Sequence, residues 1–117
     1  MKLFRRRREA PPGTVRTASS ADREHLTEFA QTRRGVEAYV EPRTTVTEMT
    51  IVLVAADGEW TRRRIPGPRA AREFGNKVGV PVYDVAATGY PQRMREWTAR
   101  RKAAGETGVP GLEGPTV

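Results

Sequence analysis

The stretch Met49–Ile65 reads MTIVLVAADGEWTRRRI and contains the strongest turn signal of the chain. Asp57-Gly58 between two strand-like runs predicts a β-hairpin with a two-residue type I′ turn, because glycine adopts positive φ freely and aspartate tolerates it. This turn pairs Ala55 with Trp60 and places four apolar residues on one face, namely Ile51, Leu53, Ala55 and Trp60. The first strand is apolar on both faces, which predicts a central position. The second strand mixes arginine with apolar residues, as an edge strand does.

A half-buried strand is predicted just upstream, where Val36–Glu41 alternates apolar and polar residues. We expect Val36, Ala38 and Val40 to face inward and Glu37, Tyr39 and Glu41 to face outward. A four-residue loop over residues 42–45 would pair Glu41 with Val46 and continue the apolar face of the hairpin into this strand. Together the three strands predict an antiparallel meander.

Two helices are predicted on either side of the meander. Ser19 or Ser20 can cap the first, which carries an apolar stripe and ends before Gly35. Pro68 suits the first position of the second helix, which ends at Gly79.

A short strand and a last helix are predicted in the C-terminal part. The strand covers Val80–Val85, and Pro81 confines it to a sheet edge or to the start of a strand. The connection from Ile65 is long enough for a crossover to a parallel neighbour. Residues 86–89 are expected to form a loop. Tyr90-Pro91 then opens a helix that runs to about Ala103.

These elements predict an α+β fold with one domain over residues 20–103. Its four-stranded mixed sheet consists of an antiparallel meander and one edge strand, covered by helices in the order α-β-β-β-α-β-α. Residues 1–18 are expected to be a disordered basic arm, and residues 104–117 a disordered tail rich in glycine and proline.

The composition points to a small cytoplasmic domain. The chain has 117 residues, of which 37% are hydrophobic and 30% are charged, enough for one core. It has no cysteine, which excludes a disulfide framework and thiolate chemistry and fits a reducing cytosol. No apolar run approaches the ~20 residues of a membrane span, and the start MKLFRRRR lacks the apolar stretch of a secretory signal.

The formal net charge is +7, but the excess lies at the two ends. Residues 1–34 hold nine Lys/Arg and four Asp/Glu, residues 35–84 hold seven of each, and residues 85–117 hold five and three. The predicted sheet is therefore neutral as a whole. An acidic partner is expected to meet the basic ends.

The residue pattern gives little support to catalysis, and no catalytic residue, metal site or cofactor is predicted. His25 is the only histidine; it has no cysteine to complete a ligand set and is expected on the surface. Asp84 ends a predicted strand, where we favour a cap or turn contact over a catalytic carboxylate. The stretch Gly75–Gly79 closes a helix, whereas a phosphate-binding loop opens one.

Candidate binding residues are basic or aromatic and suit nucleic acid, through phosphate contacts and stacking. The set comprises Arg5, Arg6, Arg7, Arg8, Arg62, Arg64, Arg93, Arg95, Trp97, Arg100, Arg101 and Lys102. Each part also has a structural alternative. The N-terminal arginines can serve solubility alone, Trp60 beside Arg62 can be a core residue, and the last helix can be a solvated face docked through Trp97.

In element order the chain resembles a double-stranded-RNA-binding domain. Five residues lie where that family has a basic, alanine-rich second helix, namely Arg69, Ala70, Ala71, Arg72 and Lys77. The last strand and the last helix of this chain have no counterpart in that family.

A second resemblance covers roughly residues 22–101 and rests on four stretches, Arg33–Glu48, Asp57–Arg64, Val82–Val85 and Gly89–Met94. These look like a family of small uncharacterised proteins of high-GC Gram-positive bacteria. The resemblance implies a cytoplasmic bacterial housekeeping or accessory protein. Such sequences sometimes carry an oxidoreductase label, but no residue here supports a redox cofactor site.

The leading expectation is a non-enzymatic binding module whose basic arms contact RNA or another polyanion, for instance on a ribonucleoprotein. The alternative is a protein-interaction or accessory subunit that uses Tyr39, Tyr90 and Trp97 as anchors. A small enzyme built around Asp84, Tyr83 and Arg93 is the third hypothesis. The sequence predicts no oligomeric state.

Overall fold

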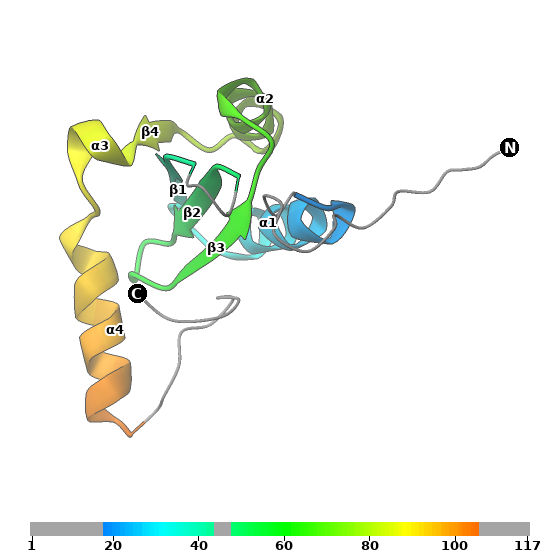
Figure 1. Cartoon of the computed structure of the whole chain (residues 1–117). Helices are drawn as coiled ribbons and strands as arrows, with labels where there is room; N and C mark the ends of the chain where they lie inside the picture. The colour runs from blue at the N-terminus through cyan, green and yellow to red at the C-terminus, as the bar shows by residue number, and fades with distance from the viewer. Residues whose placement is uncertain (1–17, 44–47, 106–117) are drawn as a thin grey trace, which may run out of the picture.

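The computed structural model describes residues 18–43 and 48–105, which form four helices and four strands (Figure 1). In chain order these are α1 (Ser20–Thr32), β1 (Glu37–Glu41), β2 (Thr50–Val54), β3 (Trp60–Arg64), α2 (Pro68–Val78), β4 (Val82–Asp84), α3 (Val85–Thr88) and α4 (Gln92–Ala103). The predicted α+β class and the order of strands and long helices are confirmed. The short helix α3 stands where a loop was expected. Nearly all of the predicted arm and tail fall outside the described residues.

The four strands form one mixed sheet in the order β3-β2-β1-β4. The first three make the expected antiparallel meander, and β4 pairs with β1 in parallel after the α2 crossover. β2 is central, as its two apolar faces predicted. β3 and β4 lie at the edges, as the arginines of the former and Pro81 beside the latter predicted.

The predicted register of the hairpin is wrong by one residue. Trp60 pairs with Val54 and not with Ala55. Because successive side chains of a strand point to opposite faces, this shift moves Trp60 away from the face that carries Ile51 and Leu53.

The cause is a three-residue loop in place of the two-residue turn. The amide of Ala55 donates to the carbonyl of Glu59 at 2.8 Å, and the amide of Gly58 donates to the carbonyl of Ala55 at 2.9 Å. Gly58 has φ +98°. All the described residues with positive φ are glycines, so Asp57 lacks the positive φ that a type I′ turn requires at its first central position.

The connection between β1 and β2 is longer than predicted. Glu41 pairs with Thr50 and not with Val46, so the predicted register is wrong by four residues. Since four is an even number, Ala38 still shares a face with Ile51, as expected. Residues 44–47 of this connection lie outside the described residues.

Helices α1 and α2 cover one face of the sheet, where the larger core lies. Leu26 of α1 and Phe74 of α2 belong to this cluster together with the strand residues Ala38, Ile51 and Leu53. The last three are completely buried. This is the face that the alternation of the first strand predicted.

Helices α3 and α4 cover the opposite face, so that α1 and α4 lie on different sides of the sheet (Figure 1). A second core cluster forms there from Tyr39, Val52, Val54, Trp60 and Met94. Tyr39 is 6% exposed and Glu41 is 9% exposed. The expectation that these two residues face outward is therefore wrong. Helix α4 and the segment that leads into it cover this face of the sheet, and the strand pattern does not reveal that cover.

Candidate nucleic-acid interface

Arg62 is bound to a buried carboxylate of the same sheet. Its Nε and NH2 atoms lie 2.9 and 3.0 Å from the two oxygens of Glu41. Thr50 donates to the same carboxylate at 2.6 Å, and the hydroxyl of Tyr90 donates to it as well. The guanidinium also lies 5.3 Å from the ring centroid of Trp60. A phosphate would have to displace Glu41 to bind Arg62 in the same two-pronged way.

Arg63 and Arg64 share the carboxylate of Asp22 at the start of α1. Their Nε atoms lie 3.6 and 3.8 Å from its oxygens. Asp22 is 6% exposed and also accepts the amide of Ser19 in the capping box of α1. Two cations and a cap offset the cost of burying this carboxylate, which ties the end of β3 to α1.

Arg93 forms a third pair, which joins α4 to β1. Its NH2 donates to Glu37 Oε1 at 2.8 Å, and its Nε donates to the carbonyl of Ala55 at 2.9 Å. The hydroxyl of Tyr39 donates to the same Glu37 oxygen at 2.8 Å. These bonds from Arg93 and Tyr39 lower the pKa of Glu37, whereas burial and the neighbouring carboxylate raise the pKa of Tyr39 to about 12.

The tip of the hairpin supports α4 at further points. Met94 is buried in the second core. The indole of Trp60 donates to Thr98 Oγ1 at 3.0 Å, and NH2 of Arg100 donates to the carbonyl of Asp57 at 3.0 Å. α4 is therefore fixed to the sheet from its first turn to its third.

Three of the remaining cations of α4 are exposed. Arg95, Arg100 and Lys102 all lie at the surface, and none of the ion pairs among the described residues includes them. The guanidinium of Arg101 lies 4.8 Å from the ring centroid of Trp97, within cation–π range. Arg95 and Lys102, two turns apart, thus present positive charge on the side of α4 opposite Trp97.

The structure brings together only part of the predicted binding set. Six members share α4, namely Arg93, Arg95, Trp97, Arg100, Arg101 and Lys102. Arg62, Arg64 and Arg93 are each held by a carboxylate. The four residues of the N-terminal run, Arg5 to Arg8, lie outside the described residues.

Sequence reasoning missed Glu37 and Glu41 as partners of these arginines. The equal numbers of acidic and basic residues in 35–84 were a signal that charges pair within the sheet. The identity of the partners was not readable, because Glu41 and Arg62 are far apart in the chain and meet only across β2.

Two of the three aromatic residues proposed as protein anchors have structural roles, and Tyr90 remains partly exposed. Tyr39 is buried in the second core, and Trp97 packs against that cluster. Trp60 is 3% exposed, which confirms its core interpretation. Tyr83 and Tyr90 are 38% and 36% exposed and are the most accessible large apolar residues of the described chain.

Asp84 is a helix cap. Its Oδ1 accepts the amide of Ala86 at 2.9 Å, at the start of α3. His25 is half-buried, with Nε2 at 2.6 Å from Thr61 Oγ1, and burial together with the charge of Arg63 lowers its pKa. Within residues 18–43 and 48–105, no group of three or more His, Cys, Asp or Glu side chains is placed to hold a metal ion.

None of the helices in the described ranges has both the length and the apolar character needed to cross a membrane. Comparison of the chain with protein-family models, curated proteins and solved structures found no significant match. The two family resemblances stated from the sequence therefore stay predictions.

Proposed function

We propose that the protein is a non-enzymatic binding module, acting in the cytoplasm, that contacts RNA or another polyanion through α4 and the basic N-terminal segment. One observation carries the proposal. The sheet arginines are neutralised pairwise by Glu37, Glu41 and Asp22, whereas α4 keeps exposed cations that no carboxylate of the described chain pairs with.

The geometry of α4 supports this role in a second way. Its contacts with the hairpin tip hold the helix in place without using Arg95 or Lys102. A rigid helix that holds out its charges loses little conformational entropy when a polyanion binds.

Binding of this kind depends steeply on salt, because each neutralised phosphate releases a counterion. For single strands, each phosphate that a cation neutralises adds about 0.7 to the steepness of log K against log salt. Replacing both Arg95 and Lys102 by glutamine should therefore reduce the slope by about 1.4 and weaken binding by more than about tenfold at ~50 mM salt.

A matched control lies on the other side of the sheet. Arg69 and Arg72 are exposed on α2, so R69Q/R72Q changes the net charge by the same amount on the far face. Fluorescence anisotropy with a labelled generic RNA at several salt concentrations measures both variants. Equal losses for the two variants, or no binding by the unmodified chain at ~50 mM salt, would contradict the proposal.

The contribution of the N-terminal segment is tested separately. Deleting residues 1–17 removes five arginines and should lower the affinity for RNA while leaving the thermal midpoint unchanged. An unchanged affinity would limit the contact to α4.

A further inference from the structure

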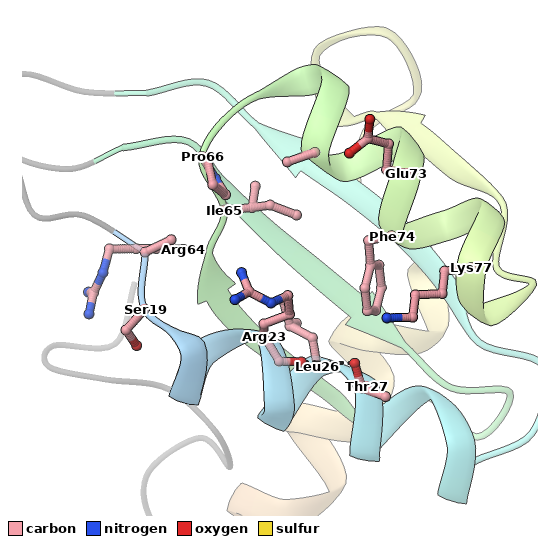
Figure 2. A pocket seen from close by; sticks show the side chains of 12 residues that line it. Ser19, Arg23, Leu26, Thr27, Arg64, Ile65, Pro66, Glu73, Phe74 and Lys77 are labelled. Carbon is pink, nitrogen blue, oxygen red and sulfur yellow. Dashed lines mark hydrogen bonds between the residues drawn. The ribbon is translucent and has the colours of Figure 1, made fainter. Parts of the chain in front are cut away.

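A cavity of about 250 Å³ lies between α1, α2 and the end of β3, on the side of the sheet away from α4 (Figure 2). Its walls are mainly apolar. Leu26 rises from α1, Phe74 and Ala70 come from α2, and Ile65 follows β3. These residues belong to the edge of the larger core or pack against it.

The rim of this cavity carries more positive than negative charge. Arg23 of α1 and Lys77 of α2 stand on opposite sides of the opening in front of Phe74 (Figure 2). No ion pair of the described residues includes Arg23 or Lys77. The acidic rim residue, Glu73, lies 3.5 Å from Arg69 outside the opening.

We propose that this cavity binds a small amphipathic anion, namely a medium-chain fatty acid carboxylate. The alkyl chain replaces water only against the part of the apolar walls that is still exposed, chiefly at Ala70, and this is favourable in proportion to the apolar area covered. The carboxylate lies between the guanidinium of Arg23 and the ammonium of Lys77, where charge-assisted hydrogen bonds are strongest.

Size and charge both select this ligand class. The volume is just below the range of about 300–1,000 Å³ typical of pockets for drug-sized molecules, so a single short chain fits better than a ring system or a long lipid. The net charge of the rim favours an anion over a neutral alcohol. Glu73 beside the opening disfavours a second negative charge on the ligand.

The test is a titration of the full chain with octanoate, followed by calorimetry or by amide chemical shifts. Butyrate keeps the carboxylate and shortens the chain, and it should bind at least about tenfold more weakly. Octylamine keeps the chain and reverses the charge, and it should also bind at least about tenfold more weakly.

Two kinds of variant locate the site. A70L fills the cavity and should weaken octanoate binding by at least about tenfold, with circular dichroism and the thermal midpoint as checks on folding. R23Q/K77Q changes exposed residues only and should remove the preference of the chain for octanoate over octylamine. R72Q, on the same helix but outside the cavity, is the control. It should change neither the affinity for octanoate nor the preference for octanoate over octylamine.

The absence of octanoate binding to the unmodified chain would overturn the proposal. So would equal binding by A70L, since the ligand would then lie elsewhere. If octanoate binds only after residues 1–17 are deleted, the segment before Ala18 fills the cavity, and the fatty acid assignment fails. The first two outcomes do not bear on the RNA proposal, because α4 lies on the other face. The third concerns only the contribution of the N-terminal segment to RNA binding and leaves that of α4 untouched.

Discussion

The backbone of Gly58 in the hairpin loop packs directly against the backbone of Arg93 in the first turn of α4. A Cβ atom on Gly58 would overlap the carbonyl oxygen of Arg93 and would lie 2.8 Å from Cβ of Trp97. The same glycine has φ +98°, a conformation that other residues rarely adopt. One position therefore sets both the hairpin turn and the place of the last helix.

We expect G58A to lower the free energy of unfolding by about 3 kcal/mol, through backbone strain and displacement of α4. Urea unfolding followed by tryptophan fluorescence measures the change. Gly79 is the matched control, because its φ is +75° but no atom lies within 4 Å of an added Cβ. G79A should cost only about 1 kcal/mol. Equal costs for the two variants would show that α4 does not rest on the hairpin tip.

E41Q should lower the free energy of unfolding by about 2–4 kcal/mol, because it leaves the positive charge of Arg62 with little compensation. The side chains of Glu41 and Arg62 are only 11% and 14% exposed. E73Q is the control, since the Glu73–Arg69 pair is 70% and 87% exposed and such pairs contribute less than about 1 kcal/mol. Thermal and urea unfolding of both variants should separate them clearly.

G75A should destabilise the protein, although alanine is favoured over glycine inside a helix by about 1 kcal/mol. A Cβ atom on Gly75 would lie 2.5 Å from Cγ2 of Val82 and 2.7 Å from the carbonyl oxygen of Val80. The double variant G75A/V82A should recover only part of the loss, because the carbonyl of Val80 remains. A stabilised G75A would mean that α2 sits farther from β4 than described.

At high pH, two tyrosines should limit stability. Burial first, and then the hydrogen bond to a glutamate, raise the pKa of Tyr39 and of Tyr90 from 10.0 to about 12. The neutral phenols are favoured in the folded protein, so this stability is complete below pH 10 and is lost as the pH rises toward 12. Y39F and Y90F should each reduce the decrease in the free energy of unfolding between pH 10 and pH 12, as measured by urea unfolding at a series of pH values. Y83F, which removes an exposed phenol, is the control.

At low pH, Glu37 should contribute in the opposite direction. Its pKa is lowered from 4.5 by hydrogen bonds from Arg93 and Tyr39, so the contribution is present above pH 4.5 and is lost as the pH falls through the folded-state value. E37Q should be less stable at neutral pH and should lose less stability on acidification. If the free energy of unfolding of E37Q and that of the unmodified chain fell equally steeply between neutral and acid pH, this prediction would be contradicted.

The sequence was sufficient for the number and arrangement of the strands and for the face that α1 and α2 cover, but not for the register of the two hairpins. Alternation of apolar residues is a local property, and the two apolar faces of β2 correctly predicted its central position. The face of Trp60 was predicted wrongly, because Asp57-Gly58 is compatible with a loop of two residues and with a loop of three, and in the structure Asp57 does not adopt the positive φ that the shorter loop requires. Because the side chains of a strand alternate between its two faces, a register shift of one residue moves every side chain to the opposite face.

The candidate interface was less predictable, since it depends on which charges neutralise one another. The sequence alone does not distinguish a paired arginine from an unpaired one. Arg62 is bound by Glu41 across β2, whereas Arg95 lies exposed on α4. The two apolar faces of β2 did contain a usable signal. Val52 and Val54 needed a cover, and Met94 with Trp97 was the remaining apolar pair that could supply it.

The order of the elements also has a consequence during synthesis. The strands that contain Val52, Val54 and Trp60 are synthesised before the helix that shields these residues, and a domain generally folds as one unit. For that interval these apolar side chains have no helix to cover them. Until Met94 has been synthesised and has packed on the sheet, the nascent chain can bind chaperones or aggregate with other copies of itself.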